Sequence, residues 1–204
     1  HVVFVGHWEA HTERYVRALR TAGLDVRVWG HNWRWAADPG LRRVVPLPHA
    51  EYVSTIARSG CALCVLSRAN RNESTGRSFE IPAIGALMLA ERTPEHTYLY
   101  GDDEGAILFS NEDELVSKAR YYLGRPGERH RIAQTGQFRV NQLGMPWEVH
   151  IEREWRIVER ILEGEFDVAD QDDAPFWPGF RQGSLPPGVS ELVKLESELQ
   201  RNRG

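Results

Sequence analysis

Residues 77–91, RSFEIPAIGALMLAE, decide the fold of this chain. Most of the stretch is apolar and predicts a buried helix that leads into a buried strand, LMLAE at 87–91. It opens, however, with polar residues: Arg77, Ser78 and Glu80 lie where the helix begins. Ser78 is predicted to be the N-cap of this helix. The stretch therefore predicts a loop, a helix and a strand, with charged side chains at the mouth of the helix.

The alternation of strands and helices extends to both sides of this stretch. Apolar runs predict strands at 1–6, 24–30, 42–48, 61–67, 87–91 and 106–110. Apolar residues at helical spacing predict helices from a Thr12 N-cap to Gly23, at 49–59, after Ser78, near 94–99, at 111–124 and after Pro126. Such alternation predicts a doubly wound α/β domain with a parallel, Rossmann-like sheet and trailing helices.

Three segments are expected along the chain. Residues 1–145 form the predicted Rossmann-like domain, and 146–164 is a long amphipathic helix that closes it. The stretch 165–204 is rich in Asp, Pro and Gly and is predicted to be a tail that can end in a short helix. Because the chain begins with a strand and without Met, we expect it to be a fragment of a longer protein.

Composition narrows the class of protein. The net charge of −4 over 204 residues does not favour a nucleic-acid partner. No segment approaches the roughly 18 apolar residues of a membrane helix, and no signal peptide is visible. Cys61 and Cys64 form a C-x-x-C, but the apolar residues around them predict a buried strand rather than a redox or metal site. Free cysteines agree with a reducing compartment, so a cytoplasmic location is predicted.

The fold class selects three loops for ligand binding. In open α/β sheets, ligands bind beyond the carboxyl ends of the strands, which here points to 6–12, 46–49 and 67–78. No P-loop, H-E-x-x-H or Ser–His–Asp pattern is present, and no metal-ligand set is predicted.

Loop 67–78 contains the most residues suited to binding a ligand. It contains Arg68, and Thr75 and Gly76 lie directly before a helix N-terminus, whose free amides and positive dipole suit a phosphate. Gly76 lets the backbone approach an anion, and Arg77 can add charge-assisted hydrogen bonds.

Glu80 allows two interpretations. An acid in the first helical turn complements the helix dipole, which is worth about 0.3–1 kcal/mol. Alternatively, a carboxylate beside a phosphate site accepts hydrogen bonds from a vicinal diol such as that of ribose. The residue pattern alone does not separate the two.

Loop 6–12 is a second candidate, although it lacks the G-x-G-x-x-G of dinucleotide sites. Gly6 ends a strand, His7 follows it, and the next helix could face an anion with its N-terminus. Arg14 lies in the first turn of that helix, where a cation opposes the dipole, which suggests a ligand phosphate. An exposed arginine is the commoner explanation.

Three tryptophans are concentrated in WGHNWRW at 29–35. A hydrophobic cover over the edge of the sheet is the favoured interpretation, and a stacking surface for a base or sugar is the alternative.

Five blocks, in order, resemble one known family. They are FVG (4–6), EYVSTIARS (51–59), RSFEIPAIGA (77–86), DELVSKARYYL (113–123) and ERHRIAQTGQ (128–137). The chain resembles the CgeB-like spore-maturation glycosyltransferases, which belong with the group 1, family 4 glycosyltransferases of GT-B fold. The resemblance spans about residues 1 to 162, and the block at 77–86 is its most specific part.

The resemblance implies the donor-binding C-terminal half of a GT-B enzyme. In the family, a glutamate at the position of Glu80 holds the donor ribose, and Arg77 and Ser78 match the element that holds the diphosphate. Arg14 matches a basic residue that reaches the diphosphate, and Leu47 lies where the base is contacted through backbone. The implied donor is a nucleoside-diphosphate sugar of UDP or GDP type, with no tightly bound cofactor.

The chain departs from the family pattern at one position. Family 4 enzymes often have a second glutamate eight residues before the helix glutamate, and here that place is Asn72, with Glu73 one residue off. The acceptor-binding N-terminal half is also expected to be missing, and the acceptor is a glycan, a protein or a small molecule.

The resemblance predicts a hexosyltransferase-type donor domain that transfers sugar with retention, with Arg77 and Glu80 as its catalytic residues. Two alternatives stay open at this point. One is a nucleotide-sugar epimerase on the same fold, and the other is a non-catalytic GT-B scaffold or glycan-binding module.

Overall fold

A computed structural model describes residues 1–69, 72–142, 155 and 159 of the chain. The chain divides into two compact units, His1–Leu143 and Gly144–Gly204, and the fold below is that of the first unit. Of the helix predicted at 146–164, only Trp155 and Glu159 are described, and both are helical. The predicted tail at 165–204 lies outside the described residues. Among the described helices, none has both the length and the apolar character needed to span a bilayer.

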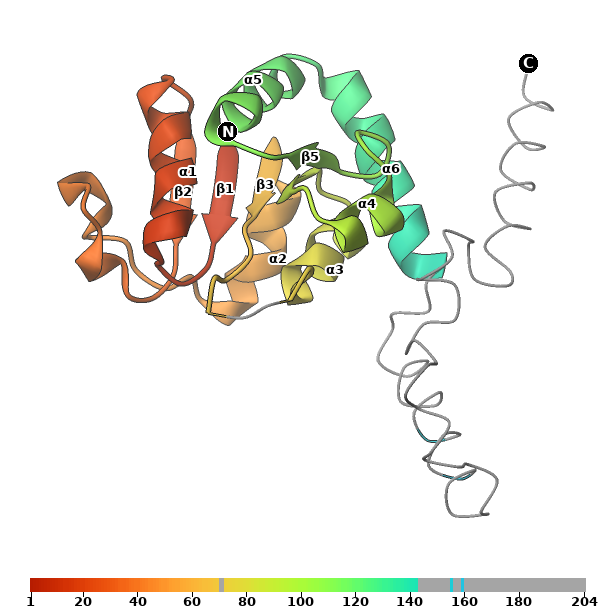
Figure 1. The fold of residues 1–204 in the computed structure, drawn as a ribbon, viewed down its shortest axis with the longest axis horizontal. Coiled ribbons are helices and arrows are strands. Elements are labelled where there is room, and N and C mark those ends of the chain that lie inside the picture. The colour runs from red at the N-terminus through yellow and green to blue at the C-terminus, as the bar shows by residue number, and fades with distance from the viewer. Residues whose placement is uncertain (70–71, 143–154, 156–158, 160–204) are drawn as a thin grey trace. The chain divides into compact units, whose positions relative to one another are not determined.

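Five short parallel strands form a single sheet in the first unit (Figure 1). The strands are β1 Val2–Val5, β2 Val26–Trp29, β3 Cys61–Cys64, β4 Met88–Glu91 and β5 Ile107–Phe109. The helices are α1 Ala10–Thr21, α2 His49–Ala57, α3 Gly76–Ala83, α4 Pro94–Tyr100, α5 Glu112–Leu123 and α6 Pro126–Gln142. Two 3₁₀ turns, Trp33–Trp35 and Pro39–Leu41, follow β2. The sheet order is β2-β1-β3-β4-β5, which confirms the predicted doubly wound, Rossmann-like fold.

The order of the strands places a topological switch point between β1 and β3. From β1 the chain moves outward to β2 on one side, and β3, β4 and β5 then add in sequence on the other side. Such a reversal leaves a crevice at the carboxyl ends of the two central strands, which is where open α/β sheets bind ligands.

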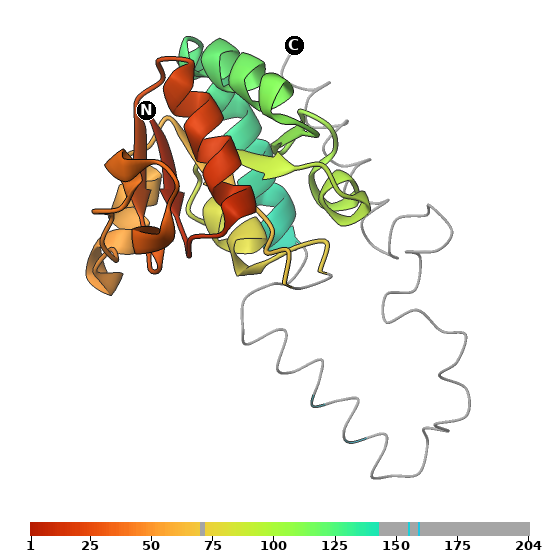
Figure 2. The same ribbon diagram turned by 60° about the vertical axis from the view of Figure 1, so that its left-hand side comes forward.

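The helices cover both faces of the sheet. One core cluster joins the strands to α1 and α5, and Figure 2 shows these two helices side by side. The other cluster joins the strands to α2, α3 and α4. Helix α6 contributes Ile132 to the first cluster and Val140 to the second, so it packs against both layers.

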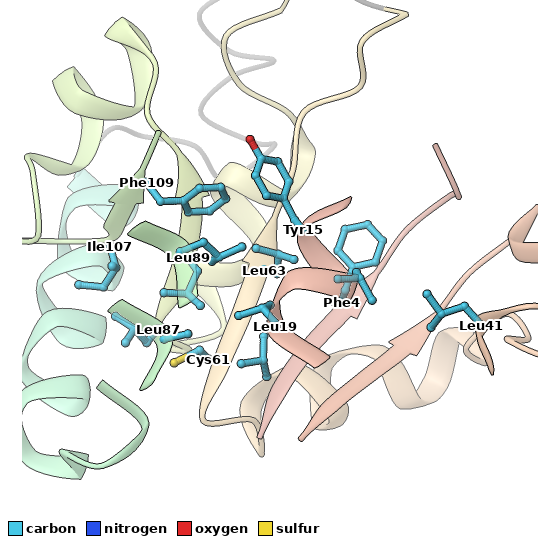
Figure 3. Packing of buried hydrophobic residues seen from close by; sticks show 14 of the residues in the cluster. Phe4, Tyr15, Leu19, Leu41, Cys61, Leu63, Leu87, Leu89, Ile107 and Phe109 are labelled. Atoms are coloured by element: carbon cyan, nitrogen blue, oxygen red, sulfur yellow. The ribbon is translucent and has the colours of Figure 1, made fainter. Parts of the chain in front are cut away.

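Strands β1, β3, β4 and β5 are buried on both faces, as central parallel strands are, whereas the edge strand β2 is only partly buried. Figure 3 shows Tyr15 and Leu19 of α1 packed against Leu63, Leu89 and Phe109 of the sheet. Tyr15 meets the Phe109 ring edge-on, with 5.0 Å between the ring centroids.

The buried-strand interpretation of the C-x-x-C is confirmed. Cys61 belongs to one core cluster and Cys64 to the other, because side chains three apart in a strand point to opposite faces. Both thiols are free. Burial raises the pKa of Cys61 to about 12 and that of Cys64 to about 11, so both remain protonated, inert core residues.

Three local predictions are wrong. Residues 42–48 do not form a strand: Val45 accepts one hydrogen bond from the Gly30 amide at 3.0 Å, but Pro46 and Pro48 have no amide to continue a ladder. Helix α1 begins at Ala10 with Glu9 as N-cap, so Thr12 lies inside the helix and is buried. Ser78 is the third residue of α3 and Thr75 is its N-cap.

The tryptophan segment divides between core and surface. Trp33 is buried against the edge of the Phe4 ring, and its Nε1 donates to the Gly6 carbonyl at 3.0 Å. Trp35, by contrast, is 62% exposed, with the Arg34 guanidinium over its ring. The hydrophobic cover is therefore made by Trp33, whereas Trp35 remains on the surface.

Glu13 of α1 is a buried carboxylate that the sequence did not single out. Its Oε1 accepts from the Asp38 amide at 2.7 Å, and its Oε2 accepts from the Ala37 amide at 2.9 Å and from Trp8 Nε1 at 2.7 Å. Burial alone would raise the pKa of this carboxyl, but the donated hydrogen bonds outweigh it and the pKa lies below its ordinary value of 4.5. Glu13 thus ties the segment after β2 to the first turn of α1.

We expect Glu13→Gln to lower the free energy of unfolding by about 1–3 kcal/mol at pH 7, because an amide cannot accept all three donors. The wild-type contribution is complete above pH 4.5 and is lost as the pH falls through the lowered pKa, since the unfolded chain then binds more protons. Urea unfolding from pH 7 to pH 3 measures both effects. The exposed Glu51→Gln is the control, and identical pH curves for wild type and Glu13→Gln would contradict the assignment.

Candidate functional site

A cleft of about 620 Å³ opens at the carboxyl edge of the sheet, at the switch point. Its walls come from the ends of β1 and β2, the segments after them, the segment after β3, and the starts of α1, α2 and α3. Its volume lies within the range of small-molecule sites, about 300–1,000 Å³. The residues that line it include Gly6, His7, Leu47, Tyr52, Thr75, Gly76, Arg77 and Glu80.

The structure brings most of the predicted site residues together in this cleft, from segments far apart in sequence. Those that line it are Gly6, His7, Leu47, Thr75, Gly76, Arg77 and Glu80. Those that do not are Arg14, Arg68 and Ser78. The roles of all of them remain predictions.

The start of α3 forms one wall of the cleft. Thr75 Oγ1 accepts from the Arg77 amide at 3.0 Å, while Ser78 Oγ accepts from the Thr75 amide at 2.9 Å, which together make a capping box. Gly76 is the first residue of the helix, so its amide has no carbonyl to bond within the helix. Because Gly76 is exposed in the cleft, this amide and the positive end of the helix are available to an anion.

Ser78 itself faces away from the cleft, which corrects its predicted place. It is fully buried, and its hydroxyl lies 2.7 Å from His96 Nε2. Its contribution to the cleft is therefore the capping box, not direct contact with a ligand.

Arg77 carries an unsatisfied donor. Its Nε is buried, and within the described residues it is the one buried side-chain polar atom without a hydrogen-bond partner. The guanidinium lies over the Tyr52 ring, 5.7 Å from its centroid, and NH1 approaches the backbone of Gly6. A buried donor left unpaired costs about 1–3 kcal/mol, so this arginine suits an anionic acceptor brought by a ligand.

Glu80 lies on the same side of α3 as Gly76 and is exposed. Its Oε2 accepts a hydrogen bond from the Tyr52 hydroxyl at 2.7 Å. Burial, together with this bond to Glu80, raises the pKa of Tyr52, so the phenol stays protonated and keeps donating. This bond holds the carboxylate at the cleft, and no cation among the described residues forms a salt bridge with it.

Tyr52 is the main site residue that the sequence did not reveal. At helical spacing it looked like a core residue of the helix predicted at 49–59, and nothing local showed that its hydroxyl reaches a helix 28 residues later. It supports both functional side chains, Glu80 through a hydrogen bond and Arg77 through its ring.

Two glycines allow the backbones after β1 and β2 to touch at the floor of the cleft. A Cβ on Gly30, whose φ is +149°, would lie 1.7 Å from the Gly6 carbonyl oxygen. A Cβ on Gly6 would lie 2.5 Å from the Phe4 ring. At Gly30 a side chain would require the backbone to move, whereas at Gly6 it would displace the Phe4 ring.

Arg14 lies away from the cleft. It donates to Glu112 in an ion pair between α1 and α5, and this bond lowers the pKa of Glu112. The cation at the start of α1 is thus explained by a partner within the fold.

Arg68 also forms its hydrogen bonds within the protein. Its NH2 donates to Glu91 Oε1 at 2.8 Å, and its amide donates to Glu9 at 3.0 Å. Neither arginine lines the cleft, and among the described arginines Arg77 is the one that does.

Glu73 does not replace the second family glutamate. Its Oε2 accepts from the Glu95 amide at 3.2 Å, and its carbonyl accepts from Thr93 Oγ1 at 2.8 Å. Glu73 therefore binds the start of α4 and does not line the cleft. In the described part of the chain, no group of three or more His, Cys, Asp or Glu side chains could hold a metal ion.

Comparison with known proteins agrees with this geometry. A family model described as glycosyl transferase-like matches residues 11–143, more than half of the chain. Curated protein sequences gave no match.

Solved structures share the fold at low identity. Sucrose-phosphate synthase from Thermosynechococcus elongatus aligns at 16% identity with a TM-score of 0.62, over 80% of this chain and 45% of that one. A mutant of phage T4 BGT in complex with UDP-glucose aligns at 17% identity with a TM-score of 0.57, over 78% of this chain and 46% of that one.

A third structure is that of a single domain. The C-terminal domain of LpcC, a glycosyl transferase group 1 family protein from Francisella tularensis, aligns at 15% identity with a TM-score of 0.53, over 69% of this chain and 84% of that one. The chain thus spans less than half the length of sucrose-phosphate synthase and of the phage protein, but most of this domain. The fold is the Rossmann-like half of a GT-B glycosyltransferase, and the match over residues 11–143 shows that the chain belongs to the glycosyl transferase-like family.

Proposed function

We propose that the cleft binds the nucleoside diphosphate of a sugar donor and that the domain supports sugar transfer to an acceptor. The observation that carries this proposal is Arg77, which lines the cleft beside the N-terminus of α3 and whose buried Nε has no hydrogen-bond partner among the described residues. A guanidinium and a free helix N-terminus that face one cleft form a site for a di-anion.

The proposed roles follow from the positions of the groups. The Gly76 amide and Arg77 bind the diphosphate, and Glu80, about one helical turn further along the same face of α3, accepts from the ribose hydroxyls. Tyr52 holds Glu80 in place. Leu47 and Pro46 offer backbone and apolar surface to the base on the opposite wall.

The proposed catalytic contribution is electrostatic. When the sugar leaves, negative charge develops on the departing diphosphate, and a pre-oriented cation and helix dipole stabilise it. Retention of configuration at the sugar and a UDP or GDP donor are part of this proposal. The phage T4 neighbour in complex with UDP-glucose makes UDP the first nucleotide to test.

The proposed enzyme needs more than this domain. The cleft described here supplies the donor side, so we propose that an N-terminal GT-B half supplies the acceptor side, with a glycan, a protein or a small molecule as acceptor. A cytoplasmic location is also proposed, where nucleotide sugars would be available.

A thermal-shift screen with UDP, GDP, ADP and dTDP sugars tests donor binding, followed by calorimetry with the nucleotide that gives the largest shift. Glu80→Ala is expected to weaken that nucleotide about tenfold, because hydrogen bonds to a charged group are worth about 1.5–3 kcal/mol. Glu128→Ala is the matched control: Glu128 is an acid near the start of another helix, α6, and it does not line the cleft. No binding of any nucleotide by wild type would refute the proposal.

A second candidate is a donor-binding module without transferase activity. The attachment of Glu73 to α4 favours it, because the cleft then lacks the second acidic group that family 4 enzymes often use. Nucleotide binding without sugar transfer by the complete protein would support this candidate, and sugar transfer would exclude it.

A further inference from the structure

A group of buried polar side chains lies behind the cleft, at the end of β4. Glu91 is 5% exposed, and its Oε2 accepts from the Leu66 amide at 2.7 Å. Its Oε1 accepts from Arg68 at 2.8 Å and from the Tyr15 hydroxyl at 3.3 Å, and it lies 2.7 Å from His11 Nε2. One carboxylate thus joins the segment after β3 to the start of α1.

The carbonyl of the same residue binds a buried histidine. His96 of α4 is fully buried, with its Nδ1 2.7 Å from the Glu91 carbonyl oxygen and its Nε2 2.7 Å from Ser78 Oγ. Because a carbonyl can only accept, Nδ1 carries the hydrogen, and in a neutral ring Nε2 then accepts from the Ser78 hydroxyl. Burial lowers the pKa of His96, which agrees with a neutral ring.

The chain of bonds ends at the helix that faces the cleft. Ser78 Oγ, oriented by His96, accepts from the Thr75 amide at 2.9 Å and so completes the capping box of α3. The Tyr100 hydroxyl donates to the Ser78 carbonyl and so stabilises the same turn of the helix. The position of the Gly76 amide and of Arg77 therefore depends on a bond between His96 and Ser78.

Each branch of this group leads to a different wall of the cleft. His11 and Tyr15 belong to α1, whose start lines the cleft through Glu9 and Thr12. Leu66 lies between Val65 and Ser67, which line the cleft after β3. The His96–Ser78 branch reaches α3. This convergence could not be predicted from the sequence, because the groups come from four separate segments.

Apolar side chains could fill this space with a smaller free-energy cost of desolvation. A buried carboxylate and a buried imidazole lose their hydration, and they are tolerated only where directional hydrogen bonds replace it. Directional bonds fix the relative placement of loops and helix ends in a way that apolar contacts do not.

We infer that Glu91 and His96, called the hub below, are positioning residues: their contacts fix the start of α1, the segment after β3 and the start of α3 relative to one another. Neither residue lines the cleft itself. The inference rests on the proposed function for its effect on nucleotide binding. Its structural part, the placement of the α3 N-terminus and of Leu66, can be measured without any ligand.

The test uses the 204-residue chain and two readouts. Amide hydrogen exchange by NMR follows Thr75 and Leu66 in the unliganded protein, and calorimetry gives the affinity for UDP and for GDP. The variants are Ser78→Ala, His96→Leu, Glu91→Gln and His96→Gln, in which the Gln oxygen can replace Nε2 as acceptor. Leu115→Ala, a buried substitution in α5, is the control for a general loss of stability.

Ser78→Ala and His96→Leu are expected to speed amide exchange at Thr75 about tenfold. They are also expected to lower the affinity for the nucleotide that wild type binds by about tenfold, the equivalent of one lost hydrogen bond. Glu91→Gln is expected to speed exchange at Leu66. His96→Gln should restore exchange at Thr75 and affinity towards wild type. At equal loss of melting temperature, Leu115→Ala should change neither readout.

Two outcomes overturn the inference: exchange at Thr75 in Ser78→Ala and His96→Leu equal to that in Leu115→Ala, or faster exchange in these two variants with unchanged affinity. If wild type binds neither UDP nor GDP, the proposed function fails, and the exchange pattern still decides whether the hub fixes α3. Ser78→Ala removes a single oxygen atom, so it keeps the test valid if His96→Leu does not fold.

Discussion

Arg77→Ala is expected to weaken UDP or GDP binding about 10- to 100-fold, because charge-assisted hydrogen bonds to phosphate are worth about 1.5–3 kcal/mol. The fold should tolerate the change. The Nε of Arg77 has no partner within the described residues, so its removal breaks no buried hydrogen bond. Loss of affinity without loss of stability is a property of a ligand-binding residue, and calorimetry and thermal unfolding of one sample measure both.

Arg131→Ala is the matched control for this experiment. Arg131 is exposed on α6 and does not line the cleft, so the variant loses the same charge from the molecule without touching the site. Arg77→Lys adds a second comparison, since a lysine keeps the charge but loses the planar fork of donors. Equal affinities for Arg77→Ala and Arg131→Ala would remove Arg77 from the site and, with it, the main support for a diphosphate.

Gly30→Ala is expected to lower the free energy of unfolding by more than about 3 kcal/mol, among the largest effects of a single substitution. The added Cβ would lie 1.7 Å from the Gly6 carbonyl oxygen, a backbone atom that cannot rotate away. The φ of +149° at Gly30 is also a conformation that residues with a side chain rarely adopt. The substitution must therefore separate the ends of β1 and β2, which form the floor of the cleft.

Gly127→Ala is the control for Gly30→Ala. Gly127 lies in the first turn of α6 and has no atom within 4 Å of an added Cβ, so alanine should stabilise the protein by about 0.5–1 kcal/mol. Urea unfolding followed by circular dichroism measures both variants. A Gly30→Ala protein with the urea midpoint of Gly127→Ala would mean that the two backbones do not approach as described.

The sequence alone was sufficient for the fold class and for the position of the cleft. Buried parallel strands are short apolar runs, and the helices between them have apolar residues at helical spacing, so local patterns define most elements. The rule that ligands bind beyond the carboxyl ends of such strands then selects loops that do meet in the structure. Arg77 and Glu80 could be placed at that edge because they lie in the first turns of a helix that follows a strand.

Local patterns failed where a second segment decided the outcome. Residues 42–48 have the apolar residues of a strand, but two prolines remove the amides that a neighbouring strand would need. Arg14 and Arg68 carry the positive charge that a phosphate site requires, but in the structure they form ion pairs with Glu112 and Glu91. The sequence of the loops does not predict either partner.

The sequence by itself determined most of the elements, their order, and the edge of the sheet at which polar side chains gather, because periodicity and helix-end chemistry act over a few neighbouring residues. Tertiary structure alone decided which charges stay free in the cleft, that Tyr52 holds Glu80, and that Glu91 and His96 connect its walls. Those outcomes depend on hydrogen bonds between segments distant in sequence, and such partners are fixed only when the chain has packed.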